Sequence, residues 1–389
     1  MKAKRRVIAG QPSWVLANGQ VELAVTELGG HMAPVTFHRD SASRVQPYYI
    51  SPWQGEKVKL DEPVLAPLRG DFFCMPFGAP GVWRGVRHIC HGEPATGKWT
   101  MGGVAVDGRV ARLTMTMRTK AMPGKVTKRL SLVDGHNVVY CQHVLEGFST
   151  PAPLGHHATL ALPDSPGALR VATSPFKLGM TNPTPFGDPA IGHYQSLAIN
   201  RKFTRLDKVP LVWKDPAVGD CSRHPVRMGF TDLLGLWARH AECPAWTTAT
   251  VQDEGFMWFS LKDPAMLPAT LLWIANRGRH SSPWNGRNRC LGLEDVCAYF
   301  ANTAAESAGP NQLNAMGIPT VVKLSKSRPT VVNHIQGVVK VPKGFECVRT
   351  ASFAPGKVTF TSVTGKKVTA PVCHEFLTTG QLEDHPWDS

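Results

Sequence analysis

The feature that most constrains this chain is a succession of short strand-like runs, each closed by a turn signal. The run Gln20–Thr26 alternates between polar and apolar residues, and residues 104–117 read as two such runs on either side of Asp107-Gly108. Another run, Val138–Leu145, begins soon after the turn signal Asp134-Gly135. Turn signals at such short intervals are typical of a sandwich, so we expect an all-β fold of antiparallel strands.

The second half of the chain continues this pattern. Further strand-like runs are Leu233–Ala238, Phe256–Leu261, Leu271–Ala275, Thr330–Val341, Cys347–Phe353 and Val358–Val363. Helical periodicity is scarce and is clearest in Glu294–Ala308, where Val296, Phe300 and Ala304 would share one face before Gly309-Pro310 ends the helix. Residues 175–192 are rich in Pro, Gly and Asn, which predicts a long loop that could form the wall of a site.

The composition indicates a packed globular protein. Apolar residues make up 42% of the 389 residues, and the 36 Gly and 32 Pro are scattered, so they punctuate strands and do not form a linker. The nine cysteines include no Cys-x-x-Cys pair, so we expect no disulfide framework and no structural zinc site, and reduced thiols favour a cytoplasmic protein. No segment reaches the roughly 18 apolar residues of a membrane span, and the basic N-terminus lacks the apolar run of a signal peptide.

The net charge of +14 favours anionic partners, among them nucleic acid and phosphorylated or acidic sugars. The basic residues are spread along the chain, and only Lys2–Arg6 and Lys125–Arg129 form clusters. Recognition-helix patterns, zinc-finger spacing and aromatic RNA-binding signatures are missing from the sequence. Nucleic acid is therefore not the expected partner.

The most informative region runs from Leu68 to Trp99. It contains Leu68-Arg69-Gly70-Asp71-Phe72-Phe73-Cys74-Met75-Pro76-Phe77-Gly78, followed by His91-Gly92-Glu93-Pro94-Ala95. Here the sequence resembles the galactose mutarotase (aldose 1-epimerase) superfamily, in particular its hexose-phosphate mutarotase branch. Members of that branch carry Arg-Gly-Gly leading into Cys-Phe-Pro-x-Phe-Gly and, further on, a His-Gly motif. Two later landmarks follow in the family's order: His156-His157 before the apolar run Ala158–Leu162, and Leu291-Gly292-Leu293-Glu294.

The resemblance implies a large antiparallel β-supersandwich with few short helices. It covers residues 20–365, which leaves residues 1–19 as an N-terminal extension and 366–389 as a C-terminal tail. It also implies an isomerase that interconverts the anomers of a small-molecule sugar without a cofactor or metal. Glu294 would be the base, His157 the acid and His91 the group that polarises the ring or C1 oxygen, while Arg69 would hold sugar hydroxyls or a phosphate. This chain has His-His-Ala-Thr where the better-known members have His-x-Tyr-Phe, so either His156 or His157 could be the family's second histidine. The apolar run that follows directly favours His157 as the acid, and His156 is then expected to bind the substrate.

The chemistry can also be argued from the residues. Exchange of sugar anomers removes a proton from the C1 hydroxyl and delivers one to the ring oxygen, so it needs a base and an acid at the anomeric carbon. A carboxylate and a histidine suit these roles near neutral pH.

A second cluster, residues 273–287, contains the mixture of side chains that a sugar site uses. It supplies an aromatic ring for stacking and planar donors for hydroxyls or for an anionic group. The residues expected to bind substrate here are Asn276, Arg279, Trp284 and Arg287.

Other interpretations of these residues remain open. Glu294 could be the first-turn acid of the helix that follows it, His91, His157 and Arg69 could be structural, and residues 273–287 could be a basic surface loop. Two other functions also remain open: a non-catalytic carbohydrate-binding protein, and a metal-dependent sugar enzyme using His88, His91, the 156–157 pair and Glu294.

Overall fold

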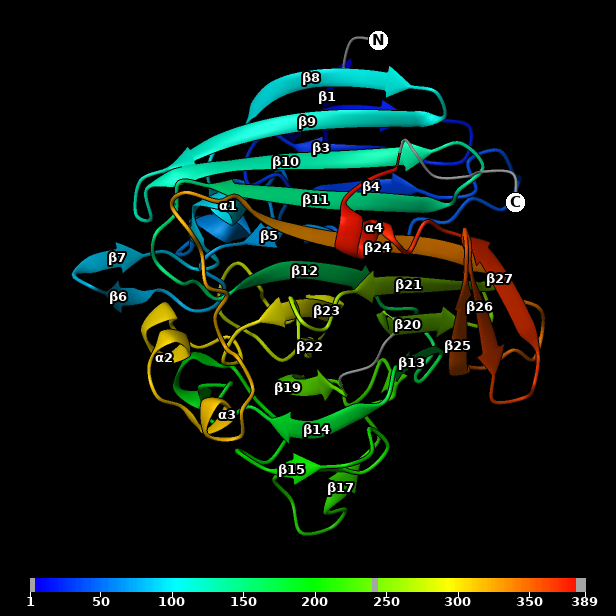
Figure 1. Ribbon diagram of the computed structural model, residues 1–389. Helices are drawn as coiled ribbons and strands as arrows, with labels where there is room; N and C mark the ends of the chain where they lie inside the picture. The colour runs from blue at the N-terminus through cyan, green and yellow to red at the C-terminus, as the bar shows by residue number, and fades with distance from the viewer. Residues whose placement is uncertain (1–3, 240–243, 383–389) are drawn as a thin grey trace.

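Two large antiparallel β-sheets form the body of the protein. The computed structural model describes residues 4–239 and 244–382 (Figure 1). The nine-stranded sheet contains, in spatial order, β18 (Arg223–His224), β13 (Leu169–Thr173), β20 (Ala245–Val251), β21 (Phe256–Lys262), β24 (Thr330–Lys340), β11 (Val138–Glu146), β10 (Gly124–Val133), β9 (Val110–Thr119) and β8 (Thr100–Asp107). The seven-stranded sheet contains β15 (Lys202–Phe203), β14 (Phe176–Thr181), β19 (Phe230–Ala238), β22 (Ala269–Asn276), β23 (Arg289–Cys297), β12 (Leu154–Ala161) and β5 (Phe73–Cys74).

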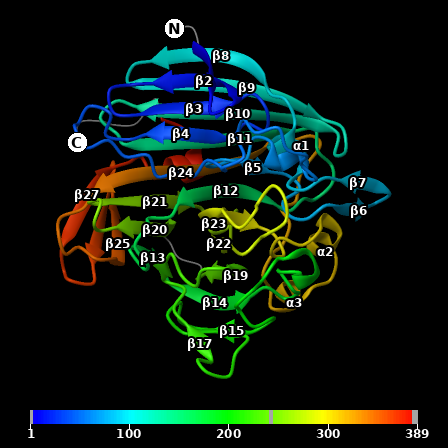
Figure 2. The ribbon, with the colours of Figure 1, turned by 180° about the vertical axis from the view of Figure 1, so that it is seen from behind.

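Smaller elements surround these two sheets. A four-stranded sheet of β1 (Lys4–Ile8), β2 (Gln11–Ala17), β3 (Glu22–Thr26) and β4 (Met32–Thr36) lies over β9–β11, as Figure 2 shows from behind. A three-stranded sheet is formed by β25 (Val348–Ala354), β26 (Lys357–Ser362) and β27 (Lys367–Pro371). The two-stranded pairs are β6 (Gly81–Trp83) with β7 (Val86–His88) and β16 (Val209–Pro210) with β17 (Val218–Gly219). The helices of the described residues are α1 (Gly92–Thr96), α2 (Ala304–Ala308), α3 (Gln312–Ala315), α4 (Phe376–Thr379) and the 3₁₀ turns Pro63–Leu65 and Pro189–Ile191.

The alternation of side chains along each strand divides the interior into two layers. On β12, Leu154, Ala158 and Leu160 belong to the large core between the two sheets, where they meet Val139 of β11 and Val332 of β24. The opposite face of the seven-stranded sheet is also buried, because the segments around residues 53, 72, 284 and 300 cover it with aromatic side chains. A strand of this sheet therefore has both faces covered, and the candidate site lies on the second face.

The all-β antiparallel architecture predicted from the sequence is confirmed, and every strand-like run named above coincides with a strand. The helix predicted over Glu294–Ala308 is wrong, because Glu294 lies in the middle of β23 and the only helical turn there is α2. Thr303 begins that short helix with a capping box to Glu306. The loop predicted over residues 175–192 contains β14 in its first part.

The two ends of the chain are integrated into the fold within the described residues. The stretch expected as an N-terminal extension forms β1 and β2, and the stretch expected as a C-terminal tail forms β27 and α4. Residues 1–3 and 383–389, which belong to those two predictions, lie outside the described residues. The basic cluster Lys125–Arg129 does not form one surface patch, because alternate residues of β10 face opposite sides of the sheet. Lys128 is buried, whereas Lys125 is partly exposed and pairs with Glu146. Within 4–239 and 244–382, the protein has no helix long and apolar enough to cross a membrane.

Candidate functional site

A buried carboxyl group and an imidazole form the centre of the candidate site. Strands β12 and β23 are antiparallel neighbours, and their register places His157 directly opposite Glu294. His157 Nε2 lies 3.1 Å from Glu294 Oε1, and only 6% and 3% of the two side chains are exposed. The structure thus brings into contact the two residues for which the sequence predicted acid and base roles; we refer to them as the Glu–His pair.

His91 is the third member of this group. It precedes α1 in a left-handed backbone conformation, with φ of 58°, which turns the chain from β7 into the helix. Its ring centroid lies 5.1 Å from that of His157, with the two rings nearly perpendicular, and 4.9 Å from that of Phe77. His91, to which the family resemblance gave a polarising role, therefore borders the Glu–His pair.

Burial controls the protonation of this site. Removal from water raises the pKa of Glu294 to about 8, because the surroundings disfavour the carboxylate. Burial, and next the neighbouring His91, hold the pKa of His157 well below its usual range, and burial lowers the pKa of His91 to about 4. Near pH 7 the Glu–His pair consequently holds one shared proton: Glu294 can donate it and His157 Nε2 can accept it. These roles are the reverse of the base and acid roles that the family resemblance implied for Glu294 and His157, because burial favours the neutral form of both groups.

Several neighbours fix the orientation of His157. Its ring stacks on Phe72, with centroids 4.5 Å apart, and Phe72 stacks in turn on His31. Thr159, two residues along β12 on the same face, places its hydroxyl 3.2 Å from His157 Nδ1. A hydrogen bond at Nδ1 orients the ring so that Nε2 points at Glu294.

Gly292 leaves the space that the carboxyl group of Glu294 occupies. A Cβ at position 292 would lie 2.6 Å from Glu294 Oε1 and 2.9 Å from the Cβ of Trp273. Glycine is therefore the residue that lets the Glu294 side chain fold back along its own strand.

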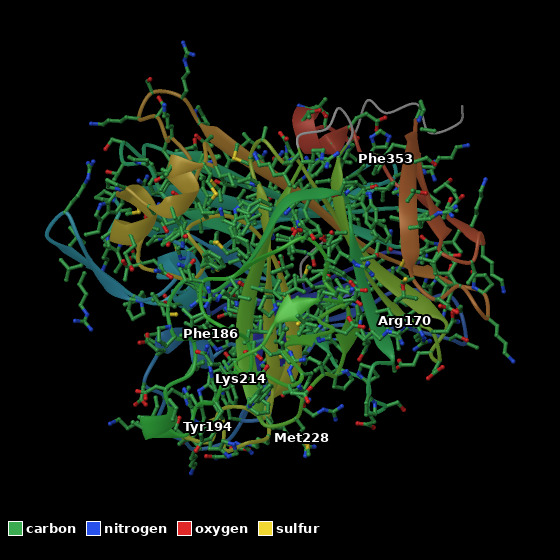
Figure 3. All side chains as sticks on the ribbon, turned by 90° about the horizontal axis from the view of Figure 1, so that it is seen from below. Arg170, Phe186, Tyr194, Lys214, Met228 and Phe353 are labelled. Atoms are coloured by element: carbon green, nitrogen blue, oxygen red, sulfur yellow. The ribbon has the colours of Figure 1, made fainter. Side chains whose placement is uncertain are left out.

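A cationic and aromatic wall adjoins the Glu–His pair. Trp273 on β22 meets the His157 ring edge-on at 5.7 Å. The guanidinium carbon of Arg279 lies 4.7 Å from the Trp284 ring centre, 5.7 Å from that of Trp273 and 5.4 Å from that of Phe186, which is labelled in Figure 3. Burial lowers the pKa of Arg279 only to about 10, so it stays charged at neutral pH. Its buried Nε has no partner in the described part of the chain, which leaves one donor available to a ligand.

The other residues proposed for substrate binding lie elsewhere. Arg69 is fully buried, and its guanidinium donates to the carbonyl oxygens of Ile8, Ala9 and Pro67, so it anchors the strand β1 to the loop before β5. Arg287 forms a two-point ion pair with Glu56. Arg69 is therefore not a side chain that a sugar reaches, and Arg287 is already bound to an acid.

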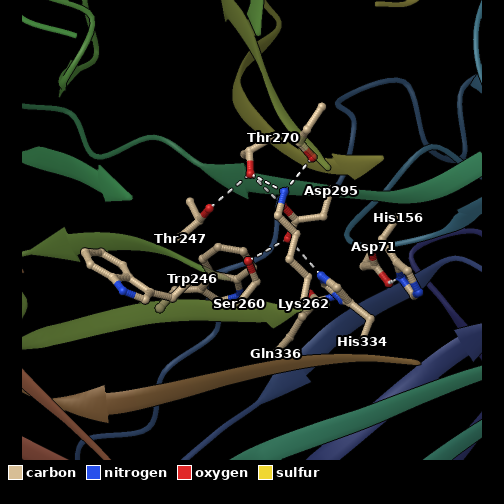
Figure 4. A network of polar contacts seen from close by, with 12 residues as sticks. Asp71, His156, Trp246, Thr247, Ser260, Lys262, Thr270, Asp295, His334 and Gln336 are labelled. Atoms are coloured by element: carbon tan, nitrogen blue, oxygen red, sulfur yellow. Dashed lines mark hydrogen bonds and ion pairs between the residues drawn. The ribbon is translucent and has the colours of Figure 1, made fainter. Parts of the chain in front are cut away.

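His156 and Asn276 point away from the Glu–His pair because neighbouring residues of a strand face opposite sides of the sheet. His156 enters the space between the two sheets, where Nδ1 lies 2.9 Å from Asp71 Oδ2 and the ring stacks on His334 (Figure 4). Asn276 donates to the carbonyl oxygen of Val226. Of the two adjacent histidines, it is His157 that meets Glu294, as the apolar run after it favoured.

Thr159, Gly292 and Phe72 also contribute to the candidate site, although none of them was a predicted site residue. The period of two along a strand could have identified Thr159, since it places that residue on the same face as His157. Gly292 could have been identified in the same way, because it lies two residues before Glu294 and so on the same face of a strand. Nothing in the sequence indicated that Phe72 would stack between two histidines.

A cavity on another face of the protein is separate from these residues. It has a volume of about 550 Å³ and lies on the outer face of the nine-stranded sheet, beneath α4. Arg129, Gln142, Asn333 and Gly380 contribute to its wall. None of the residues predicted for sugar chemistry lines it.

Comparison with solved structures identifies the architecture. The chain has the galactose mutarotase-like fold. It matches a candidate aldose 1-epimerase from Klebsiella pneumoniae with a TM-score of 0.59 and 13% identity, over 87% of this chain and 83% of the other. It matches a galactose mutarotase-like protein from Clostridium acetobutylicum with a TM-score of 0.57 and 10% identity, over 87% and 97% of the two chains. A candidate mutarotase from Salmonella typhimurium also gives a TM-score of 0.57, with 11% identity over 87% and 94%.

No protein-family model matches the sequence, and no curated protein is similar to it. At 10–13% identity, these structural matches establish the fold, and they leave the chemistry to be argued from the site.

Proposed function

We propose that this galactose mutarotase-like protein is a mutarotase, an isomerase of the aldose 1-epimerase type that exchanges sugar anomers through the Glu–His pair. The observation that carries the proposal is the 3.1 Å contact between His157 Nε2 and Glu294 Oε1 in surroundings that raise the pKa of Glu294 to about 8. A buried carboxyl group whose pKa is moved toward neutrality, in contact with a histidine, is typical of catalytic sites.

The geometry suits the reaction. The C1 hydroxyl and the ring oxygen of an aldose are bonded to the same carbon, so the group that takes a proton and the group that gives one must lie close together. Ring opening needs an acceptor for the proton of the C1 hydroxyl and a donor of a proton to the ring oxygen. The Glu–His pair offers one of each. His91, which is neutral at pH 7 because burial lowers its pKa to about 4, can donate one ring N–H to the oxygen that gains negative charge.

The wall beside the pair supports an aldose substrate, including one that carries a phosphate or carboxylate. Trp273 and Trp284 offer apolar faces, and Arg279 offers a cationic donor. An Arg279→Met variant should raise KM for an aldose phosphate more than KM for the unphosphorylated aldose, with kcat little changed. An equal effect on both substrates would assign Arg279 to packing.

One observation favours a second candidate, a non-catalytic sugar-binding protein. The Glu–His pair is nearly closed to solvent, and Arg279 stacks over the aromatic rings next to it. A sugar would reach the pair only after the arginine and its aromatic neighbours move aside. A binder would use the outer wall alone and would not need the pair.

Anomer exchange on a panel of aldoses and aldose phosphates, followed by NMR or polarimetry, separates the two candidates. Glu294→Gln keeps the shape of the side chain and removes its exchangeable carboxyl proton, so the mutarotase proposal requires exchange to fall to the uncatalysed rate. Glu146→Gln, on an exposed ion pair of β11, is the matched control and should retain wild-type exchange. Sugar binding without acceleration in the wild-type protein would establish the binding protein instead.

We also propose a cytoplasmic location. The eight cysteines within 4–239 and 244–382 are all free thiols, and six of them are buried, which supports a reducing compartment. Cys243 lies outside the described residues.

A further inference from the structure

A cluster of potential metal ligands lies between the two large sheets, apart from the Glu–His pair. Asp71 precedes β5, His156 lies on β12, and Cys141 and His143 lie two residues apart on the inner face of β11. All four are at most 1% exposed. One ligand atom from each of Asp71, Cys141 and His156 lies within 4.8 Å of the others.

The polar atoms of this cluster are incompletely satisfied. Asp71 Oδ1, His156 Nε2 and both ring nitrogens of His143 are buried without a hydrogen-bond partner in the described parts of the protein. The His143 ring centroid lies 5.0 Å from that of His156. A buried polar group without a partner costs roughly 1–3 kcal/mol, so four such atoms in one place point to a ligand that the cluster binds.

We propose that Asp71, Cys141 and His156 bind a divalent transition metal ion of the zinc class, with His143 as the fourth ligand. The donor set of one carboxylate oxygen, one thiolate and two imidazole nitrogens is the mixture that Zn²⁺ accepts in tetrahedral sites. In such a site the ligand atoms lie about 2.0–2.3 Å from the metal and therefore roughly 3.3–3.8 Å from one another. Among Asp71, Cys141 and His156 the present separations of up to 4.8 Å would contract by about 1 Å, which rotation of the side chains can supply. The His143 ring, whose centroid lies 5.0 Å from that of His156, would turn toward the three to complete the site.

The position of the ligands assigns the metal a structural role. Cys141 and His143 belong to the nine-stranded sheet, whereas His156 belongs to the seven-stranded sheet. A metal bound by all of them would join the two layers of the sandwich. His157, the next residue on β12, faces the other side of its sheet, so the metal would not enter the sugar chemistry.

Lys128 is the charged group that opposes metal binding here. It lies directly opposite His143 in the register of β10 and β11, is buried, and donates from Nζ to the carbonyl oxygen of Gly30 at 2.6 Å. Charge attraction between Asp71 and Lys128 partly balances the site without a metal. The incoming divalent ion carries a charge of the same sign as Lys128, so the lysine repels it. Once bound to the Cys141 thiolate and the Asp71 carboxylate, the ion forms a neutral unit with them and leaves the Lys128 charge without the attraction of Asp71. Lys128→Met should therefore tighten metal binding.

The test uses Co²⁺, whose thiolate complexes absorb in the near-ultraviolet and whose tetrahedral complexes absorb in the visible. The full-length protein is freed of metal with a chelator in denaturant and refolded with one equivalent of CoCl₂. The proposal requires both absorptions in the wild-type protein, a metal content of about one ion per chain by elemental analysis, and a higher melting temperature than in the metal-free protein. In Cys141→Ser the thiolate band should disappear, while Cys297→Ser, which changes another buried thiol on β23, should keep it.

The wild-type spectrum decides the matter even where a variant fails to fold. A refolded wild-type protein with no thiolate-to-cobalt band overturns the proposal and leaves buried water as the partner of these polar atoms. A band that survives in folded Cys141→Ser would overturn it as well, by placing the metal at another cysteine. Neither result depends on the proposed mutarotase activity.

Discussion

The raised pKa of Glu294 makes a sharp prediction about stability. In the folded protein burial moves this pKa from 4.5 to about 8, so between these values the folded state holds a proton that the unfolded state has lost. The folded protein is then favoured at low pH, and the free energy of unfolding should fall as pH rises. The stabilisation is fully present below pH 4.5 and is lost progressively until pH passes the folded value near 8.

The size of the effect on the free energy of unfolding follows from the size of the pKa change of Glu294. Each unit of pKa difference corresponds to about 1.36 kcal/mol, so a rise of about 3.5 is worth about 5 kcal/mol over the whole range. Between pH 5 and pH 9, where most of this titration takes place, the wild-type protein should lose about 4 kcal/mol through this group. Gln at position 294 has no proton to lose, and Glu294→Gln should therefore lack this component.

Urea denaturation at half-unit steps of pH, for the wild-type protein and for Glu294→Gln, measures the effect. Contributions of all other titrating groups are common to both proteins, so the difference between the two curves isolates position 294. The exposed Glu146→Gln control should run parallel to the wild-type curve. If the wild-type and Glu294→Gln curves are also parallel within about 1 kcal/mol, the buried carboxyl group is ionised in the folded state and our account of the site is wrong.

Three further predictions concern the neighbours of the Glu–His pair and the buried polar network. Thr159→Val removes the hydroxyl that orients His157. Steady-state kinetics should show kcat for anomer exchange about tenfold lower with KM unchanged, because a tenfold change corresponds to the free energy of about one hydrogen bond. A rise in KM alone would contradict this prediction. Gly292→Ala places a methyl group 2.6 Å from Glu294 Oε1 and displaces the carboxyl group. The variant should still fold, with kcat for anomer exchange lower by about 10- to 100-fold. Full activity would show that the carboxyl group is not held where we place it. Asp295→Ala leaves the buried Lys262 without its ion pair (Figure 4). Urea denaturation should show that the free energy of unfolding falls by about 3–5 kcal/mol, and the double variant Lys262→Met/Asp295→Leu should recover much of this loss. A loss under about 1 kcal/mol would exclude a charged Lys262.

The extent to which the sequence predicted the fold depended on the range of the interactions. Strands such as β8, β9 and β11 were predictable because their alternation and their Asp-Gly turns are local signals. The error at Glu294 has a physical origin as well. Strand β23 is buried on both faces, so its apolar residues lack the period of two, and Val296 and Phe300 happen to fit a helical spacing.

The candidate site was predicted in part for a similar reason. Sequence motifs and the family resemblance identified Glu294, His157 and His91, which the fold brings together. Arg69 was assigned to the substrate because the resemblance matches it to the family's Arg-Gly-Gly segment and because the fork of donors of a guanidinium can hold sugar hydroxyls or a phosphate. Only the structure shows that its donors are bound to the carbonyl oxygens of residues 8, 9 and 67, two of which lie some sixty positions away.

By itself, the sequence determined that this chain forms short antiparallel strands around an apolar core, since alternation, turn residues and composition act over a few neighbouring residues. It also supplied the candidates for acid–base chemistry, through its motifs and their resemblance to a known family. Only the tertiary structure decided which of them meet. The register between β12 and β23 places His157 against Glu294 and sends His156 into the opposite layer, beside Asp71. The raised pKa of Glu294 is likewise a tertiary effect, because desolvation depends on what the rest of the chain packs around a carboxyl group.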